Sequence, residues 1–267
     1  LPLCGDQNIS FDQVEIFLRN KKTINSKIVD LKKINFLPKL VKKRVFADIK
    51  KITSKRKAFS QTHIMGILNM TPDSFSDGGR YNKKIKAFNR IKKMINYGAD
   101  IIDIGGESTR PKSKIISAKD EWKRIKEIIK NFKKKYPKTL LSIDTRKSKI
   151  MLEGTRYKAD IINDVSCFAF EKKSMQLIRN KNLFKVIHHM QGTPQTMQIN
   201  PKYNHVLLDI YDFFESKIKD FKKTRYSNKL ILDPGIGFGK NLKHNLMLLN
   251  KISLFHSLGF PILIGTS

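Results

Sequence analysis

From residue 63 onward, short apolar runs alternate with longer segments of helical periodicity. Runs typical of buried strands occupy residues 63–69, 100–105, 140–145, 160–165, 184–190, 230–234 and 261–266. Segments with apolar residues at i, i+3 and i+4 lie between them, at about 83–97, 117–135, 147–157, 171–181, 203–222 and 241–257. Buried strands that alternate with helices indicate a parallel sheet covered by helices. Seven strands predict an α/β protein, a (β/α)8 TIM barrel truncated after the seventh strand.

A glycine-rich segment at 235–240, Gly-Ile-Gly-Phe-Gly-Lys, tests the competing model of a doubly wound sheet. The dinucleotide-binding fingerprint requires a small residue at the position of Lys240, and the P-loop requires glycine where Pro234 stands. Neither motif is present, so the barrel is favoured.

Residues 1–62 differ from this pattern and carry fifteen Lys or Arg against five Asp or Glu. Their apolar runs are too short for periodicity to distinguish strand from helix. The basic triplets at 42–44 and 55–57 indicate exposed, linker-like segments. We therefore expect a basic N-terminal segment at 1–62 and one domain at 63–267, because no Gly/Ser-rich linker interrupts the second part.

The net charge of +31 suggests either an anionic partner such as nucleic acid or a general excess of lysine. The lysines are spread through every helical segment without a recognition motif, so we do not expect nucleic-acid binding. No apolar run approaches 18 residues, which argues against a membrane span. Cys4 and Cys167 are far apart and suggest no disulfide framework, so we expect a cytoplasmic protein.

Six successive strands end in polar side chains, namely Asn69, Asp103, Asp144, Asn163 with Asp164, His188 with His189, and Asp233. Active sites of parallel barrels lie at the carboxyl ends of their strands. Because an unpaired buried carboxylate is costly, we expect these side chains to converge on a ligand. Carboxylates and amides together suit a flat heterocycle with an amino-pyrimidinone edge. No Ser-His-Asp or Cys-His arrangement has sequence support, so acyl chemistry is not expected.

Two loops are too rich in Gly, Pro and hydroxyl groups to be simple connectors. They are 71–79, Thr-Pro-Asp-Ser-Phe-Ser-Asp-Gly-Gly, and 105–111, Gly-Gly-Glu-Ser-Thr-Arg-Pro. Arg110 either holds an anion through charge-assisted hydrogen bonds or is an ordinary solvated loop arginine.

The segments 65–79 and 105–111 resemble the signatures of the dihydropteroate synthase family. The similarity continues in the same order through 142–145, 161–164, 189–194 and 232–241. Membership implies the joining of 6-hydroxymethyl-7,8-dihydropterin diphosphate to 4-aminobenzoate, which gives dihydropteroate and diphosphate. It also implies these small molecules as partners, Mg²⁺ as cofactor and a homodimer for the full-length protein.

The resemblance implies roles for individual strand-end residues. Asp103, Asn163 and Asp233 match positions that bind the pterin edge. Asp144 matches a position near the pterin ring, where a carboxylate can stabilise the cation formed as diphosphate leaves. Asn69 matches a position close to the diphosphate-bound Mg²⁺, for which an amide oxygen is a suitable ligand.

The resemblance also implies roles for loop residues. Substrate contacts are implied for Phe75, Thr109, Arg110, Pro111, Phe238, Lys240 and Gly265. Phe75, Arg110 and Pro111 belong to loops that shape the aminobenzoate site and shield the intermediate from water. Arg110 joins Asp144 and Asn69 as an implied catalytic residue.

The sequence departs from the family pattern at two places. The family's seventh-strand motif continues beyond Gly265-Thr266-Ser267 with Arg-Lys, so a lysine contact to pterin, and the Arg and His of the last strand, are not in this sequence. His188 stands where many members have methionine, and a charge there would weaken pterin binding.

Residues 3–31 are similar to the end of hydroxymethyldihydropterin pyrophosphokinase, although Phe17-Leu18-Arg19 replaces the expected Pro-His-Pro. The segment 1–62 is thus interpreted as a remnant of that domain plus a linker. Two alternative functions stay open, a pterin-binding methyltransferase of the same superfamily and a non-catalytic pterin-binding protein. The two long loops favour the synthase over the methyltransferase.

Overall fold

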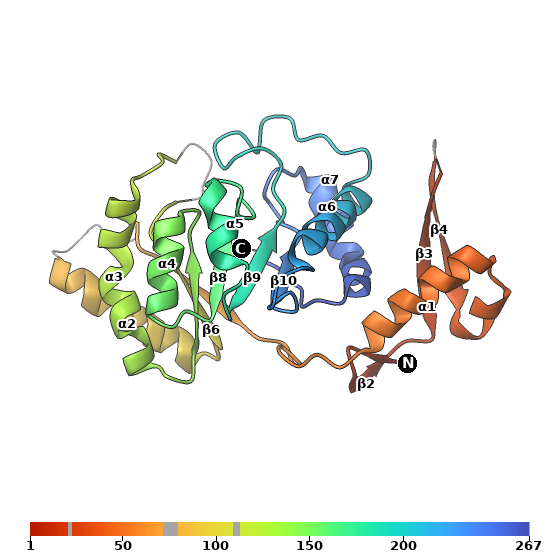
Figure 1. Cartoon of the computed structure of the whole chain (residues 1–267), viewed down its shortest axis with the longest axis horizontal. Coiled ribbons are helices and arrows are strands. Elements are labelled where there is room, and N and C mark those ends of the chain that lie inside the picture. The colour runs from red at the N-terminus through yellow and green to blue at the C-terminus, as the bar shows by residue number, and fades with distance from the viewer. Residues whose placement is uncertain (21–22, 72–79, 109–112, 267) are drawn as a thin grey trace. The chain divides into compact units, whose positions relative to one another are not determined.

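The computed structural model describes residues 1–20, 23–71, 80–108 and 113–266. The chain divides into two compact units (Figure 1). The smaller unit contains Leu1–Gln61 with Ile252–Pro261, and the larger contains Thr62–Lys251 with Ile262–Ser267.

The larger unit is built on a six-stranded parallel sheet. Its strands are β5 (Met65–Asn69), β6 (Ile101–Gly105), β7 (Leu140–Asp144), β8 (Ile161–Asp164), β9 (Phe184–His188) and β10 (Leu230–Asp233). They are hydrogen-bonded in sequence order, and every neighbouring pair is parallel. This order confirms the predicted α/β class and is that of six successive strands of a (β/α)8 barrel.

The seventh predicted strand, at 261–266, is only a bridge in the described part of the chain. Ile262 pairs in parallel with Leu232, and the Leu263 N–H donates a 2.8 Å hydrogen bond to the Leu232 carbonyl. The segment therefore lies beside β10, where a seventh strand would be expected, but does not extend along it.

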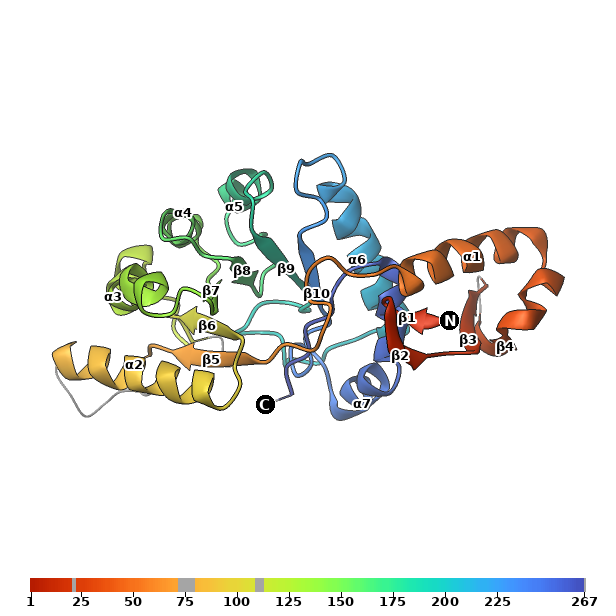
Figure 2. The same cartoon turned by 90° about the horizontal axis from the view of Figure 1, so that it is seen from below.

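In the described part of the larger unit a helix follows each strand, and these helices lie on the outer side of the curved sheet (Figure 2). They are α2 (Arg80–Asn96), α3 (Ala118–Lys135), α4 (Ser148–Arg156), α5 (Lys172–Ile178), α6 (Val206–Phe221) and α7 (Leu242–Asn250). In the part of the chain that the structure describes, no helix combines the length and the apolar character needed to cross a membrane.

Helix α3 shows why these segments are helical. The Ser117 side chain caps its first turn by accepting a 3.1 Å hydrogen bond from the Asp120 N–H. Acidic residues occupy the first turn and lysines the last, which complements the helix dipole. Ile125, Ile129 and Phe132, at the predicted helical spacing, are at most 1% exposed and form the buried side of the helix.

The helix predicted at 241–257 is wrong in its second half. Helix α7 ends at Asn250, and residues Ile252–Leu258 form a separate 3₁₀ helix, η3, that belongs to the smaller unit. Phe255 and Leu258 are three residues apart, so they share one side of a 3₁₀ helix. Both are buried. Packing within the smaller unit thus explains why this segment forms a 3₁₀ helix and does not continue α7.

The smaller unit combines short antiparallel strands with a helix. Its elements are β1 (Pro2–Leu3), β2 (Asp6–Ser10), β3 (Gln13–Arg19), β4 (Ile24–Asp30), η1 (Leu31–Phe36) and α1 (Lys39–Thr53). Its buried cluster consists of Val29, Ile34, Val45 and Ile49. The basic triplet at 42–44, which we interpreted as linker-like, lies inside α1. The charges there belong to a helix that buries its apolar side.

Candidate active site

The sheet register aligns polar residues at the carboxyl ends of the first four strands. Asn69 pairs with Gly105, Gly105 with Asp144, and Asp144 with Asn163. Paired residues in adjacent strands point to the same face, and so do residues two apart in one strand. Asp103 therefore shares this face with the other four positions, on the side of the sheet away from the helices.

The same face continues across the last two strands. Asn163 pairs with Val186, two residues before His188, and His188 pairs with Asp233. The register thus places side chains from six strand ends on one face, which we call the polar face: Asn69, Asp103, Asp144, Asn163, His188 and Asp233.

Gly105 leaves room for its neighbours on the polar face. A β-carbon built on Gly105 would lie 3.1 Å from Asp144 Oδ2 and 3.4 Å from Asn69 Oδ1. The side chains of Asn69 and Asp144 therefore approach one another across β6. A glycine at this strand position marks a close approach of polar groups.

Asp103 and Asn163 form the centre of the site. Asn163 Nδ2 donates a 2.9 Å hydrogen bond to Asp103 Oδ2. The other two oxygens, Asp103 Oδ1 and Asn163 Oδ1, are buried and have no hydrogen-bond partner among the described residues. Burial raises the pKa of Asp103, the neighbouring Ser142 and Asn163 side chains partly offset this effect, and the negative charge of Asp233 adds to it. Two unpaired buried acceptors are unusual in a folded protein and call for N–H donors.

Asp144 lies beside this pair in an electrostatically unfavourable position. Burial raises its pKa well above the usual range, and the carboxylates of Asp103 and Glu121 raise it further. A ligand with N–H donors or positive charge would relieve this cost. The polar face is therefore suited to a ligand that donates hydrogen bonds or develops positive charge.

Asp233 is held by the loop that follows β10. Its Oδ1 accepts a 2.8 Å hydrogen bond from the Gly235 N–H, and its Oδ2 lies 4.0 Å from His188 Nε2. The edge of the His188 ring meets Phe238, with ring centroids 4.8 Å apart. Burial lowers the pKa of His188, so the imidazole is neutral at pH 7. The positive charge on His188, which we considered from the sequence as a cause of weaker pterin binding, is therefore not expected at neutral pH.

The family resemblance implies that Lys240 contacts the substrate, but its ammonium group is occupied by contacts within the chain. Its Nζ donates 2.8 Å hydrogen bonds to the carbonyls of Gly235 and Phe238, and lies 3.2 Å from His189 Nδ1. These contacts use the three donors of the ammonium group within the chain. Burial lowers the pKa of Lys240 to about 7, although Asp233 acts in the opposite direction. Lys240 thus holds the loop around Phe238, and its contact with substrate stays a prediction.

Two other strand-end residues point away from the polar face. Asp164 accepts hydrogen bonds from the N–H groups of Ser166 and Phe168, at 2.7 and 2.9 Å. The His189 ring packs edge-on against Phe213 of α6, with centroids 4.9 Å apart. Asp164 and His189 therefore stabilise the loops and the helix layer.

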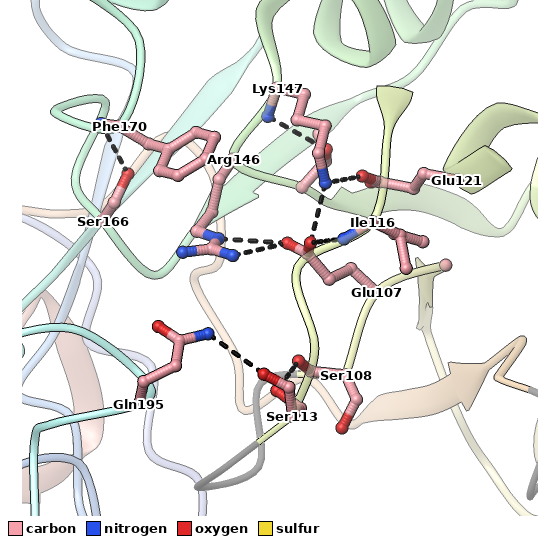
Figure 3. Close-up of polar contacts among 12 residues, drawn as sticks. Glu107, Ser108, Ser113, Ile116, Glu121, Arg146, Lys147, Ser166, Phe170 and Gln195 are labelled. Carbon is pink, nitrogen blue, oxygen red and sulfur yellow. Dashed lines mark hydrogen bonds and ion pairs between the residues drawn. The ribbon is translucent and has the colours of Figure 1, made fainter. Parts of the chain in front are cut away.

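A buried ionic cluster next to the polar face was missed by sequence analysis. Glu107, Glu121, Arg146 and Lys147 form ion pairs with N–O distances of 2.6 to 2.9 Å (Figure 3). Two signals could have indicated it. Glu107 stands between glycine and serine in the loop after β6, and the two cations follow Asp144 almost directly.

Four of the implied site residues, Phe75, Thr109, Arg110 and Pro111, lie outside the described residues. Gly265 is exposed and follows the bridge of Ile262 with Leu232. The polar face therefore contains the strand-end residues of the site that the family resemblance implies, but not these loop residues.

The described residues contain no group of three or more His, Cys, Asp or Glu side chains that could hold a metal ion. Magnesium, however, is commonly bound by one or two protein oxygens together with substrate phosphates. The exposed side chain of Asn69 places its amide oxygen over Gly105 on the same side as Asp144. This donor set fits a magnesium ion that a diphosphate brings with it.

Comparisons with known proteins agree with this geometry. A family model described as "Pterin binding enzyme" matches residues 65–267. Dihydropteroate synthase of Escherichia coli K12 is 41% identical over 209 residues, which cover 78% of this chain and 73% of the relative. The chain belongs to the dihydropteroate synthase family.

Solved structures of this family resemble the chain as well. The dihydropteroate synthase of Yersinia pestis, solved with a sulfonamide drug complex, has a TM-score of 0.72 and 39% identity, and the match covers 78% of this chain and 76% of that one. The enzyme of Xanthomonas albilineans in complex with 7,8-dihydropteroate has a TM-score of 0.68 and 29% identity, with 79% and 74% covered. The chain therefore combines the fold of this family with the polar face described above.

Proposed function

We propose that the chain catalyses the condensation of 6-hydroxymethyl-7,8-dihydropterin diphosphate with 4-aminobenzoate, giving 7,8-dihydropteroate and diphosphate. The observation that carries this proposal is the pair of unpartnered buried acceptors, Asp103 Oδ1 and Asn163 Oδ1. The amino-pyrimidinone edge of a pterin presents several N–H donors in one plane. Asp103, Asn163 and Asp233 would accept these donors, while Asn163 Nδ2 keeps Asp103 in place.

The family members reported above support condensation over the alternatives. The enzyme from Xanthomonas albilineans binds 7,8-dihydropteroate, the product of the proposed reaction. The reported relatives are synthases, which favours condensation over methyl transfer and over binding without catalysis.

Asp144 would act on the charge that develops during the reaction. The C–O bond to the diphosphate breaks with its electron pair leaving on oxygen, and the methylene carbon becomes positive. The amino nitrogen of 4-aminobenzoate then forms the new C–N bond and loses a proton. Burial raises the pKa of Asp144, so its carboxylate is costly in the free protein. A nearby positive charge lowers that cost, so the interaction is strongest when the cation forms.

Magnesium would bind at Asn69 together with the substrate diphosphate. When bound, it would neutralise the charge that collects on the leaving group. The Asn69 amide oxygen supplies a hard ligand at the end of β5, on the side of Asp144.

The loop residues would complete the site as the family resemblance implies. Arg110 and Thr109 would contact the diphosphate or the loops around it, and Phe75 and Pro111 would shape the aminobenzoate site. Phe238 would line the pterin ring beside His188.

We also propose a homodimer and a cytoplasmic location. Family resemblance supports the homodimer, and its test is the mass of the purified protein in solution. Cys4 and Cys167 are both free thiols, which suits a reducing compartment.

The test combines binding and turnover. Calorimetry should detect binding of 6-hydroxymethyl-7,8-dihydropterin diphosphate, and diphosphate release should depend on 4-aminobenzoate. Asp103→Asn should weaken pterin binding by about 10- to 100-fold, because it disturbs a hydrogen bond to a charged group. Asp220→Asn, on the exposed side of α6, is the matched control and should change neither quantity. Absence of pterin binding, or release that ignores 4-aminobenzoate, would refute the proposal.

A further inference from the structure

The buried ionic cluster of Glu107, Glu121, Arg146 and Lys147 is centred on Glu107 and is here called the Glu107 cluster. Glu107 Oε2 accepts hydrogen bonds from Arg146 Nε at 3.1 Å and Nη2 at 2.7 Å. Its Oε1 accepts one from Lys147 Nζ at 2.9 Å, and the same Nζ reaches Glu121 Oε2 at 2.6 Å (Figure 3). All four side chains are at most 6% exposed. The cluster therefore has two negative and two positive groups that water hardly reaches.

Glu107 also holds the two described ends of the connection between β6 and α3. It lies two residues after Gly105, and its Oε1 accepts a 3.1 Å hydrogen bond from the Ile116 N–H, just before α3. Nearby, Arg124 donates a 2.8 Å hydrogen bond to the Gly106 carbonyl. One carboxylate thus fixes where this connection leaves the sheet and where it enters the helix.

The cations of the cluster belong to the connection that follows Asp144. Arg146 and Lys147 come two and three residues after that carboxylate, and Thr145 Oγ1 accepts a 3.2 Å hydrogen bond from the Lys147 N–H. The Arg146 guanidinium also lies 4.4 Å from the centre of the Phe170 ring, in the connection after β8. Glu107 and Arg146 together therefore connect the segments that follow three adjacent strands, β6, β7 and β8.

Fold stability alone is a weak explanation for such a cluster. Buried ion pairs are often no more stabilising than apolar side chains of the same volume, because removing the charges from water is costly. Burial alone would raise the pKa of Glu107, but hydrogen bonds from Lys147, Arg146 and Ile116 lower it below the usual range. Glu107 therefore stays charged at neutral pH, and its four hydrogen bonds persist under working conditions.

We propose that Glu107 is a positioning residue for catalysis, which holds Asp144 and the start of the β6–α3 connection in place through Arg146 and Lys147. This inference rests on the proposed function, because it assigns Glu107 to the synthase site. Glu107 lies outside the set Asp103, Asn163 and Asp233 that would bind the pterin edge. Its loss should therefore affect turnover much more than pterin binding.

The test uses Glu107→Gln, which keeps the side-chain shape and removes the charge. We expect kcat to fall about 10- to 100-fold, since a small misplacement of a catalytic group has effects of this size. The Kd for the pterin diphosphate should change less than about threefold. Glu127→Gln is the matched control, because Glu127 is a half-exposed glutamate of α3 that lies 3.7 Å from Lys84 Nζ. It should leave both quantities unchanged.

Hydrogen exchange supplies a readout that does not depend on turnover. Glu107→Gln should speed amide exchange in residues 113–117 and 141–148, and Glu127→Gln should not. If the single variant fails to fold, Glu107→Gln with Arg146→Met removes one charge of each sign and keeps the ion pair between Lys147 and Glu121. This double variant should fold while showing the same losses.

The outcomes separate this inference from the proposed function. Unchanged exchange in both segments, or an unchanged kcat, would overturn the role of Glu107 while leaving pterin binding and condensation intact. Equal loss of kcat and pterin affinity would also overturn it, because that result indicates general disruption. Failure of the unmodified protein to bind pterin would instead refute the proposed function, and the exchange measurement would still decide whether Glu107 holds these segments.

Discussion

Asn163 and Asp103 hold one another by a 2.9 Å hydrogen bond while each leaves one buried oxygen without a partner. Their strands, β8 and β6, are separated by β7, so the contact crosses a whole strand on the polar face. Because buried acceptors are normally paired, the arrangement is suited to a ligand that arrives with N–H donors. The arrangement also makes the site sensitive to charge.

Asn163→Asp tests that sensitivity. The change places a carboxylate oxygen where Nδ2 now donates to Asp103, so two carboxylates must share a proton or repel one another. We expect the Tm to fall by about 3 to 10 °C at pH 8, and by less at pH 5 where a shared proton is available. Asn89→Asp, on the exposed side of α2, is the control for thermal unfolding at both pH values. Equal Tm values for the wild type and Asn163→Asp at pH 8 would contradict the geometry.

Asp144→Asn should stabilise the free protein and impair turnover. The pKa of Asp144 in the folded protein lies well above its unfolded value because of burial and neighbouring carboxylates. The folded state thus binds more protons than the unfolded state between these two pKa values, and stability falls as pH rises through this window. The amide avoids that loss, so the Tm of the variant should exceed that of the wild type at pH 8.

The difference should shrink as the pH approaches the unfolded value of 3.8. Each kcal/mol corresponds to about 2 to 4 °C in a domain of this size, so thermal unfolding from pH 4 to 8 can resolve the trend. We expect kcat to fall about 100-fold or more, as for other groups that stabilise developing charge. A variant that is less stable than the wild type at pH 8 would show that the Asp144 carboxylate is favourably placed in the free protein.

Much of the polar face could be expected from the sequence because strands of parallel sheets end together. The apolar runs located the strands, and each run ended in the polar residue that the register now aligns, from Asn69 on β5 to Asp233 on β10. The sequence could not tell which member of an Asn-Asp or His-His pair faces inward. Asn163 and His188 do, whereas Asp164 and His189 face the loops and helices, because adjacent residues alternate between faces.

Contacts between residues distant in the sequence account for what was missed. Glu107 is paired with side chains 39 and 40 residues away, and the local sequence on either side shows the charges without showing that they pair. Similarly, the periodicity at 241–257 fits one α-helix, but burial of Phe255 within the smaller unit gives a separate 3₁₀ helix. Tertiary packing overrides local propensity at both places.

Lys240→Met should change how stability depends on pH. The pKa of Lys240 falls to about 7 in the folded protein because of burial, against 10.5 as its ordinary value. Between these values the unfolded state binds more protons, so stability from this group rises with pH and is lost as pH falls through about 7. The wild type should therefore gain stability relative to Lys240→Met from pH 7 to 10, by up to about 1.4 kcal/mol per pH unit.

Denaturant unfolding at several pH values measures this slope. Lys50→Met is the control, because Lys50 is an exposed lysine of α1, far in the sequence from the loop that Lys240 holds. If the free energy of unfolding of the wild type and of Lys240→Met changed equally with pH, the Lys240 amine would be well solvated. That result would contradict its hydrogen bonds to the loop carbonyls.

Gly105→Ala tests whether the space over β6 matters for turnover. The added methyl group would lie 3.1 Å from Asp144 Oδ2 and 3.4 Å from Asn69 Oδ1, so both side chains must shift by a few tenths of an ångström. Asp103 and Asn163 keep their own hydrogen bond, and pterin affinity should change less than threefold, on the order of 0.6 kcal/mol. We expect kcat to fall by about tenfold or more, because Asp144 and the proposed magnesium ligand move together. Steady-state kinetics alongside calorimetry measure the two effects, and an undiminished kcat would show that Asn69 and Asp144 need not approach one another across Gly105.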